Sequence, residues 1–134
     1  MSAFTPEVLL RGEQSAGNAS LILNTVPARW PGPPLHRHDF DEAFYILEGE
    51  LTFQLGDALV SRGPGELVFA PRGADHTLAN QGDAPARYLL LCTPAGFERY
   101  FDALAAGAEI TDELRATWPE VVTVGPQIGD RRPE

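Results

Sequence analysis

The segment Leu35–Gly49 reads Leu-His-Arg-His-Asp-Phe-Asp-Glu-Ala-Phe-Tyr-Ile-Leu-Glu-Gly, and it holds two of the three histidines of the chain, His36 and His38. Side chains two residues apart point to the same face of a β-strand, so a strand here would carry both imidazoles side by side. Glu42 keeps this phase if the chain between them stays extended. Two imidazoles and a carboxylate on one face can bind a divalent metal. We therefore expect a metal site here. His76 can complete it only if the fold places that residue beside the other three.

Short strand-like runs separated by turn signals surround this segment. Glu42–Leu47 and Leu51–Leu55 flank Gly49, which is expected at the turn of a hairpin. From residue 20 to residue 93, turn residues recur roughly every eight to twelve positions, a spacing typical of an antiparallel sandwich or barrel. We expect an N-terminal extension with a peripheral strand over residues 1–19, a β-barrel over 20–93 and a C-terminal segment over 94–134.

After Pro94 the spacing of apolar residues becomes helical. Phe97, Phe101 and Leu104 share one face of a predicted helix, and Thr111 resembles the start of a second. The sequence therefore predicts one or two short C-terminal helices packed on the barrel, followed by a frayed tail from residue 127.

Composition limits the function classes. The 134 residues fit one domain, and the net charge is −9, with arginine as the sole basic residue type. Such an acidic chain is not expected to bind nucleic acid or an anionic membrane by charge. Cys92 is the only cysteine, which excludes an internal disulfide. With no secretory signal and no run of about 20 apolar residues, a soluble cytoplasmic protein is expected.

A second segment, Gly65–Asn80, reads Gly-Glu-Leu-Val-Phe-Ala-Pro-Arg-Gly-Ala-Asp-His-Thr-Leu-Ala-Asn. Together the two segments resemble the signature motifs of the cupin superfamily. The first motif, Gly-x5-His-x-His-x3,4-Glu-x6-Gly, is matched by His36, His38, Glu42 and Gly49. Its leading glycine is the exception, because Gly32 lies one or two residues too close to His36. The second motif, Gly-x5-Pro-x-Gly-x2-His-x3-Asn, is matched at every position by Gly65, Pro71, Gly73, His76 and Asn80.

The resemblance implies an all-β fold, the double-stranded β-helix or jelly roll, with one divalent transition metal inside the barrel. The implied ligands are His36, His38, Glu42 and His76. Three neutral imidazoles and one carboxylate suit Fe, Mn, Ni, Co, Cu or Zn, and they leave open positions on a five- or six-coordinate ion. The glycines, Pro71 and Asn80 are expected to have structural roles.

The motifs do not determine the reaction, because one fold can host many chemistries. The leading hypothesis is a metal-dependent oxygenase similar to the quercetin-dioxygenase-like cupins, acting on a small phenolic or diketone-like substrate, with Glu42 as both ligand and general base. A non-oxidative cyclase, isomerase or lyase is the second hypothesis, and a non-catalytic metal- and ligand-binding module is the third. Phe44, Ile46 and Leu78 are candidates to line the substrate pocket, although ordinary core packing explains them equally well. We also expect a homodimer formed by sheet extension or edge-strand exchange.

Overall fold

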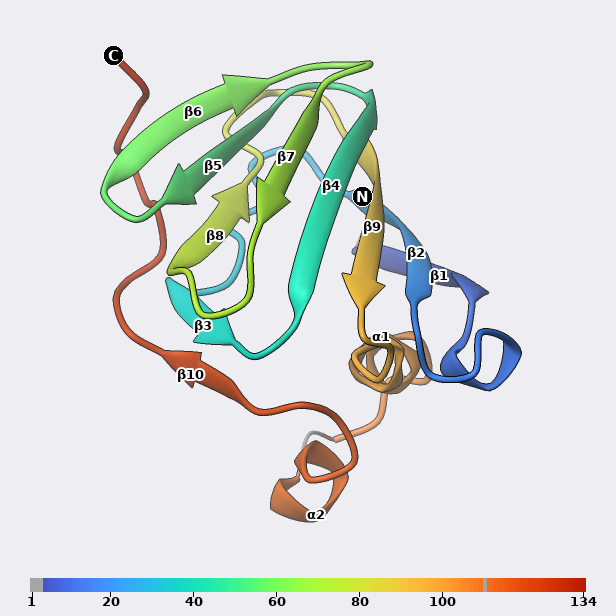
Figure 1. Cartoon of the computed structure of the whole chain (residues 1–134). Helices are drawn as coiled ribbons and strands as arrows, with labels where there is room; N and C mark the ends of the chain where they lie inside the picture. The colour runs from blue at the N-terminus through green and yellow to red at the C-terminus, as the bar shows by residue number, and fades with distance from the viewer. Residues whose placement is uncertain (1–3, 110) are drawn as a thin grey trace.

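The computed structural model describes residues 4–109 and 111–134. Within them, ten strands form two antiparallel sheets of five strands each (Figure 1). The first sheet has the order β1 (Thr5–Leu10), β2 (Ser20–Val26), β9 (Ala86–Thr93), β4 (Asp41–Glu48) and β7 (Leu67–Ala70). The second has the order β10 (Val121–Thr123), β3 (His36–His38), β8 (His76–Ala79), β5 (Leu51–Leu55) and β6 (Ala58–Arg62). The remaining elements are a 3-10 turn, η1 (Gly12–Gln14), and two helices, α1 (Glu98–Ala105) and α2 (Asp112–Arg115).

The predicted all-β jelly roll with two short C-terminal helices is confirmed. Between β3 and β9 the chain passes repeatedly from one sheet to the other, so strands close in sequence face each other across the barrel. This crossing places β4 opposite β3 and β8. Side chains on the inner face of β4 therefore meet side chains on the inner faces of β3 and β8.

The core fills the space between the two sheets. Inward residues of β4 alternate with outward ones, and the inward Phe44 meets Phe53 of β5 from the opposite sheet, with ring centroids 5.2 Å apart. Ile22, Ile46 and Leu51 are fully buried in the same cluster. The period-2 pattern of the sequence thus reflects one buried and one solvent-facing side of the first sheet.

The C-terminal segment lies along the second sheet. The frayed tail expected from residue 127 is instead packed on the barrel. The short strand β10 pairs with β3, and farther along Ile128 is buried. The Arg131 guanidinium donates a hydrogen bond to Gln54 of β5 at 2.8 Å, and the Gln127 amide donates one to the backbone carbonyl of Gly32 at 2.7 Å. Figure 1 shows this segment, in red, beside β3 and β5. The tail is therefore held by tertiary contacts that the local sequence does not reveal.

A close backbone contact requires glycine at position 32. Its φ is +72°, and an added Cβ would lie 1.8 Å from the backbone carbonyl oxygen of Leu78 in β8. The backbone before β3 therefore contacts β8 directly, and only glycine allows that approach. The contact helps to place His36 beside His76, to which it is paired in register. None of the helices among the described residues is long and apolar enough to cross a membrane.

Candidate metal centre

Four side chains from three strands converge inside the barrel. β3 supplies His36 and His38, β4 supplies Glu42, and β8 supplies His76. Each offers one ligand atom, and these four atoms all lie within 4.8 Å of one another. The fold thus brings His76 back to the other three residues. The cluster could hold a metal ion, whose identity the residues do not specify.

Backbone carbonyls orient all three imidazoles in the same way. The Nδ1 atoms of His36, His38 and His76 lie 2.7, 3.0 and 2.9 Å from the carbonyl oxygens of residues 34, 40 and 74. A carbonyl can only accept a hydrogen bond, so each Nδ1 carries a proton and each Nε2 remains available. A metal-binding histidine needs this arrangement, in which the second nitrogen fixes the tautomer and the ring orientation.

The Glu42 carboxylate lies at the centre of the cluster and is only 3% exposed. The Nε2 atoms of His38 and His76 each lie 2.7 Å from its Oε1 atom. Both Nδ1 atoms already hold protons. Each contact between an Nε2 atom and the carboxylate therefore requires either a proton on that Nε2 atom as well or a cation in the place of that Nε2 proton. The donor set therefore fits a divalent transition metal, with one carboxylate and three imidazoles as ligands.

Burial and hydrogen bonding act in opposite directions on these groups. Burial alone would raise the pKa of Glu42, but hydrogen bonds from His38 and His76 outweigh it and lower that pKa to about 2. Burial would lower the pKa of His76, yet the hydrogen bond and charge of Glu42 raise it overall. At His36 burial dominates and lowers the pKa, which keeps that imidazole neutral. Glu42 is therefore an ionised ligand at neutral pH.

Aromatic rings pack around the cluster, and of these only Phe44 was predicted to lie near the site. The ring of Phe40 stacks on His38 with centroids 3.6 Å apart, and Phe97 lies 6.3 Å from the same imidazole. Phe44 lies 6.4 Å from His76. Phe40 shares the parity of His38 and Glu42, so its position could have been inferred. Phe97 immediately precedes α1, and its helical spacing predicts packing on the barrel but not its position beside His38.

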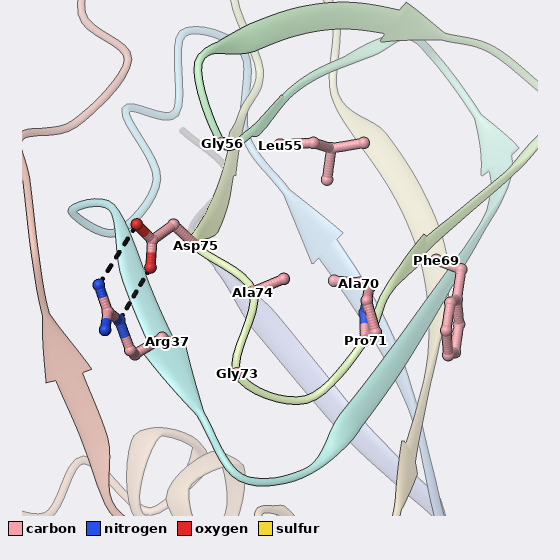
Figure 2. A pocket seen from close by; sticks show the side chains of 9 residues that line it. All are labelled: Arg37, Leu55, Gly56, Phe69, Ala70, Pro71, Gly73, Ala74 and Asp75. Carbon is pink, nitrogen blue, oxygen red and sulfur yellow. Dashed lines mark hydrogen bonds and ion pairs between the residues drawn. The ribbon is translucent and has the colours of Figure 1, made fainter.

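A cavity of about 460 Å³ lies at the edge of the barrel (Figure 2). Its lining includes Leu55 and Ala70, which are paired in register with His76 and Glu42. Registered partners in antiparallel strands point to the same side, so these two lining residues are direct strand neighbours of two cluster residues. None of the four cluster residues itself lines the cavity. The full lining comprises Arg37, Leu55, Gly56, Phe69, Ala70, Pro71, Gly73, Ala74 and Asp75. A smaller cavity of about 260 Å³ reaches His38 directly.

The three residues predicted to line a substrate pocket are buried, and their contact with a substrate stays a prediction. Phe44, Ile46 and Leu78 are 3%, 0% and 5% exposed, and the lining of the 460 Å³ cavity consists of other residues. An ion pair borders that cavity, in which Arg37 Nε donates to Asp75 Oδ1 at 2.9 Å, as Figure 2 shows. Neither residue of this pair was among the predicted site residues.

The remaining motif residues have structural roles. Gly49, Gly65 and Gly73 all have positive φ. The Asn80 side-chain amide donates to the carbonyls of Pro27 and Ala84, at 3.0 and 2.8 Å, and its oxygen accepts from the Gly82 backbone at 3.0 Å. Pro71 borders the 460 Å³ cavity.

Similar proteins carry related sequences and folds. Endoribonuclease YbeY of Myxococcus xanthus (strain DK1622) is 32% identical over 81 residues, which make up 60% of this chain and 27% of that protein. Tetracenomycin polyketide synthase protein TcmJ of Streptomyces glaucescens is 33% identical over 60 residues, 44% of this chain and 40% of that protein. The chain therefore matches well under half the length of these two relatives.

Among solved structures, the polyketide cyclase RemF from Streptomyces resistomycificus superposes with a TM-score of 0.60 and 26% identity, covering 69% of this chain and 66% of that one. A family model described as Cupin domain matches residues 23–92. This span runs from β2 to β9, covers more than half of the chain and contains all four residues of the cluster. The chain belongs to the cupin domain family.

Proposed function

We propose that this protein is a metal-dependent enzyme that moves protons on a small organic substrate without oxidising it, as a cyclase, isomerase or lyase does. The observation that carries the proposal is the buried Glu42 carboxylate, whose Oε1 atom lies 2.7 Å from two imidazole Nε2 atoms. A bound divalent metal would act as a Lewis acid on a substrate carbonyl or phenol oxygen.

Glu42 would accept the substrate proton. The carboxylate is ionised at neutral pH, so its oxygen atoms can accept a proton from the substrate. The three histidines would hold their Nε2 atoms toward the metal through their backbone hydrogen bonds. The rings of Phe40 and Phe44 would limit the access of water to the buried carboxylate.

The cavity at the barrel edge suggests the substrate class. Its volume of about 460 Å³ lies within the usual range for a small-molecule site, roughly 300–1,000 Å³. Leu55, Phe69 and Pro71 give it an apolar wall, and the Arg37–Asp75 pair supplies polar groups at its border. A flat, largely apolar molecule with several carbonyl or phenol oxygens fits such a site. The names of TcmJ and RemF, which both concern polyketides, support the same class.

The donor set favours a second candidate function, a metal-dependent oxygenase. Three imidazoles and one carboxylate suit redox-active ions such as Fe, Mn, Ni or Cu as well as Zn. The substrate class would be the same, so oxygen consumption is the measurement that separates the two reactions.

The metal assignment is tested first, by elemental analysis of protein purified under identical conditions. We expect wild type to retain about one divalent transition metal per chain, and His76→Ala and Glu42→Gln to retain much less. Glu50→Gln is the matched control, because it makes the same chemical change at an exposed hairpin residue. Equal metal content in all four proteins would refute the site.

The reaction is tested next with metal-loaded protein and a linear poly-β-ketone or a phenolic diketone in a sealed oxygen electrode. Product formation without oxygen uptake, lost in Glu42→Gln and kept in Glu50→Gln, is the expected result. Oxygen uptake in proportion to product would favour the oxygenase. Tight binding of these compounds without turnover of any of them would favour a binding module.

A further inference from the structure

The cavity of about 460 Å³ has one cation in its lining. Among the described residues that line it, Arg37 is the only cationic side chain and Asp75 the only anionic one, and the others are apolar residues or glycines. Figure 2 shows the Arg37–Asp75 pair on one side of the cavity and Phe69 on the other. A ligand in this cavity therefore meets an apolar wall on one side and a guanidinium on the other.

Asp75 occupies one edge of this guanidinium and leaves another edge open. The Nε atom of Arg37 donates to Asp75 Oδ1 at 2.9 Å, and its Nη2 atom donates to Oδ2 at 3.5 Å. No described residue accepts a hydrogen bond from Nη1. A guanidinium carries five N–H donors in a rigid planar fork, which can bind a carboxylate through two parallel N–H groups. The edge formed by Nη1 and Nη2 is therefore available to a second anion.

The backbone fixes the position of Arg37 relative to the metal cluster. Arg37 lies between His36 and His38 in β3, and the alternation of a strand turns its side chain away from both imidazoles. An anion on the guanidinium would thus be held outside the coordination sphere of a metal. Such a contact binds a part of the substrate that does not react and helps to orient the part that does.

The charges around Arg37 indicate which cavity suits an anion. The smaller cavity also includes Arg37 in its lining, but Asp39 and Glu120 make that cavity acidic. The whole chain carries a net charge of −9, so an anionic ligand is repelled over most of the surface and needs a local cation. In the larger cavity, Arg37 faces a single carboxylate among the described lining residues, and that carboxylate also holds the guanidinium in place. The larger cavity is therefore the more favourable of the two.

We propose that Arg37 is a specificity-determining residue, which binds an ionised carboxylate of the substrate, and that Asp75 positions its guanidinium. The inference rests on the proposed function, because it adds a feature to that substrate, a carboxylate remote from the oxygen atoms that face the metal. No bond forms or breaks at Arg37, which contributes binding and orientation alone.

The test is the affinity for cinnamate and for its methyl ester, measured by isothermal titration calorimetry. The two probes share a flat apolar body, and only cinnamate is charged. Wild type should bind cinnamate roughly five- to tenfold more tightly than the ester, because a charge-assisted bidentate contact is strong but this guanidinium is half exposed. Arg37→Gln should remove the preference. Arg72→Gln is the matched control and should keep it, since Arg72 is equally exposed and pairs with an aspartate but lines neither cavity.

Asp75→Asn distinguishes a binding site from an ordinary ion pair. The amide oxygen of asparagine can still accept a hydrogen bond from Arg37 Nε, while the competing negative charge is gone. The preference for cinnamate should therefore be kept or increased, whereas a purely structural pair would make the Arg37 and Asp75 variants change alike. Loss of the preference in Asp75→Asn or Arg72→Gln, its persistence in Arg37→Gln, or its absence in wild type would overturn the proposal.

The same titrations after chelator treatment separate this inference from the metal and the reaction. The preference should persist, and its disappearance would mean that the metal binds the carboxylate, which would overturn the role of Arg37. If metal binding or turnover fails while the pattern of affinities holds, the proposed function is refuted and the binding of acids at Arg37 is not.

Circular dichroism establishes that each variant is folded. If Arg37→Gln does not fold, Arg37→Lys keeps the positive charge but lacks the planar fork, and it should lower the preference at least about twofold. An unchanged preference in that variant would equally overturn the proposal.

Discussion

Removing the negative charge of Glu42 should change how the stability of the metal-free protein depends on pH. The pKa of this carboxyl is about 2 in the folded protein and 4.5 for the free side chain. A group with a depressed folded pKa stabilises the fold above its unfolded pKa, and this stabilisation is lost as the pH falls through the folded value. A difference of more than two units corresponds to about 3 kcal/mol above pH 4.5.

The measurement is urea denaturation of chelator-treated wild type and Glu42→Gln between pH 5.5 and pH 3. We expect the stability difference between them to shrink by roughly 2 kcal/mol over this range, because the carboxylate becomes protonated more readily in the unfolded chain. Comparing the two proteins cancels the acid sensitivity of the other carboxylates, which both share.

Glu50→Gln serves as the control and should follow wild type at each pH, since that side chain is exposed. Parallel stability curves for wild type and Glu42→Gln would refute the reasoning. They would mean that the two imidazoles do not stabilise the buried carboxylate in the folded, metal-free protein.

Three further predictions concern the frame of the site and its metal. Gly32→Ala should lower the free energy of unfolding by about 3 kcal/mol or more, because its Cβ would lie 1.8 Å from the Leu78 carbonyl oxygen. Gly65 also has a positive φ but open space around it, so Gly65→Ala should lower the free energy of unfolding by only about 1 kcal/mol. Equal losses for the two variants on urea denaturation would contradict the close approach of Gly32 to Leu78. Ile128→Ala should destabilise by about 2–4 kcal/mol in the same assay, and an unchanged midpoint would show that the C-terminal segment is not packed. Bound metal should be released as the pH falls below about 6.5, the usual imidazole pKa, because protons compete for the Nε2 atoms; full retention at about pH 4 would argue against histidine ligation.

Much of the donor cluster follows from the parity of residues along two strands. His36, His38 and Glu42 share a phase, and an extended chain must present such residues to one side. Parity alone does not bring His76 to the same point, and for this the resemblance of its segment to a known motif was needed. The structure shows the physical reason, which is the pairing of β8 with β3.

The open space beside the cluster could not be predicted in the same way. The alternation of side chains places Phe44 on the inner face of β4. Whether the space beside Phe44 is open depends on the ring of Phe53 across the barrel. The cavity lies instead at the barrel edge, where Leu55 and Ala70 come from different sheets. Likewise, β10 is too short to be recognised from three residues, and its strand conformation comes from pairing with β3.

The three carbonyls that hold the imidazole rings belong to the main chain at Pro34, Phe40 and Ala74. Exchanging a side chain on a neighbouring strand leaves these acceptors where they are. Under the proposed function, substrate selectivity could therefore be changed by side-chain substitutions that leave the orientation of the imidazole Nε2 atoms unchanged. For protein engineering this makes Leu55 of β5 and Phe69 of β7 the natural positions to randomise, whereas Pro71 shares a turn with Ala74 and should be kept.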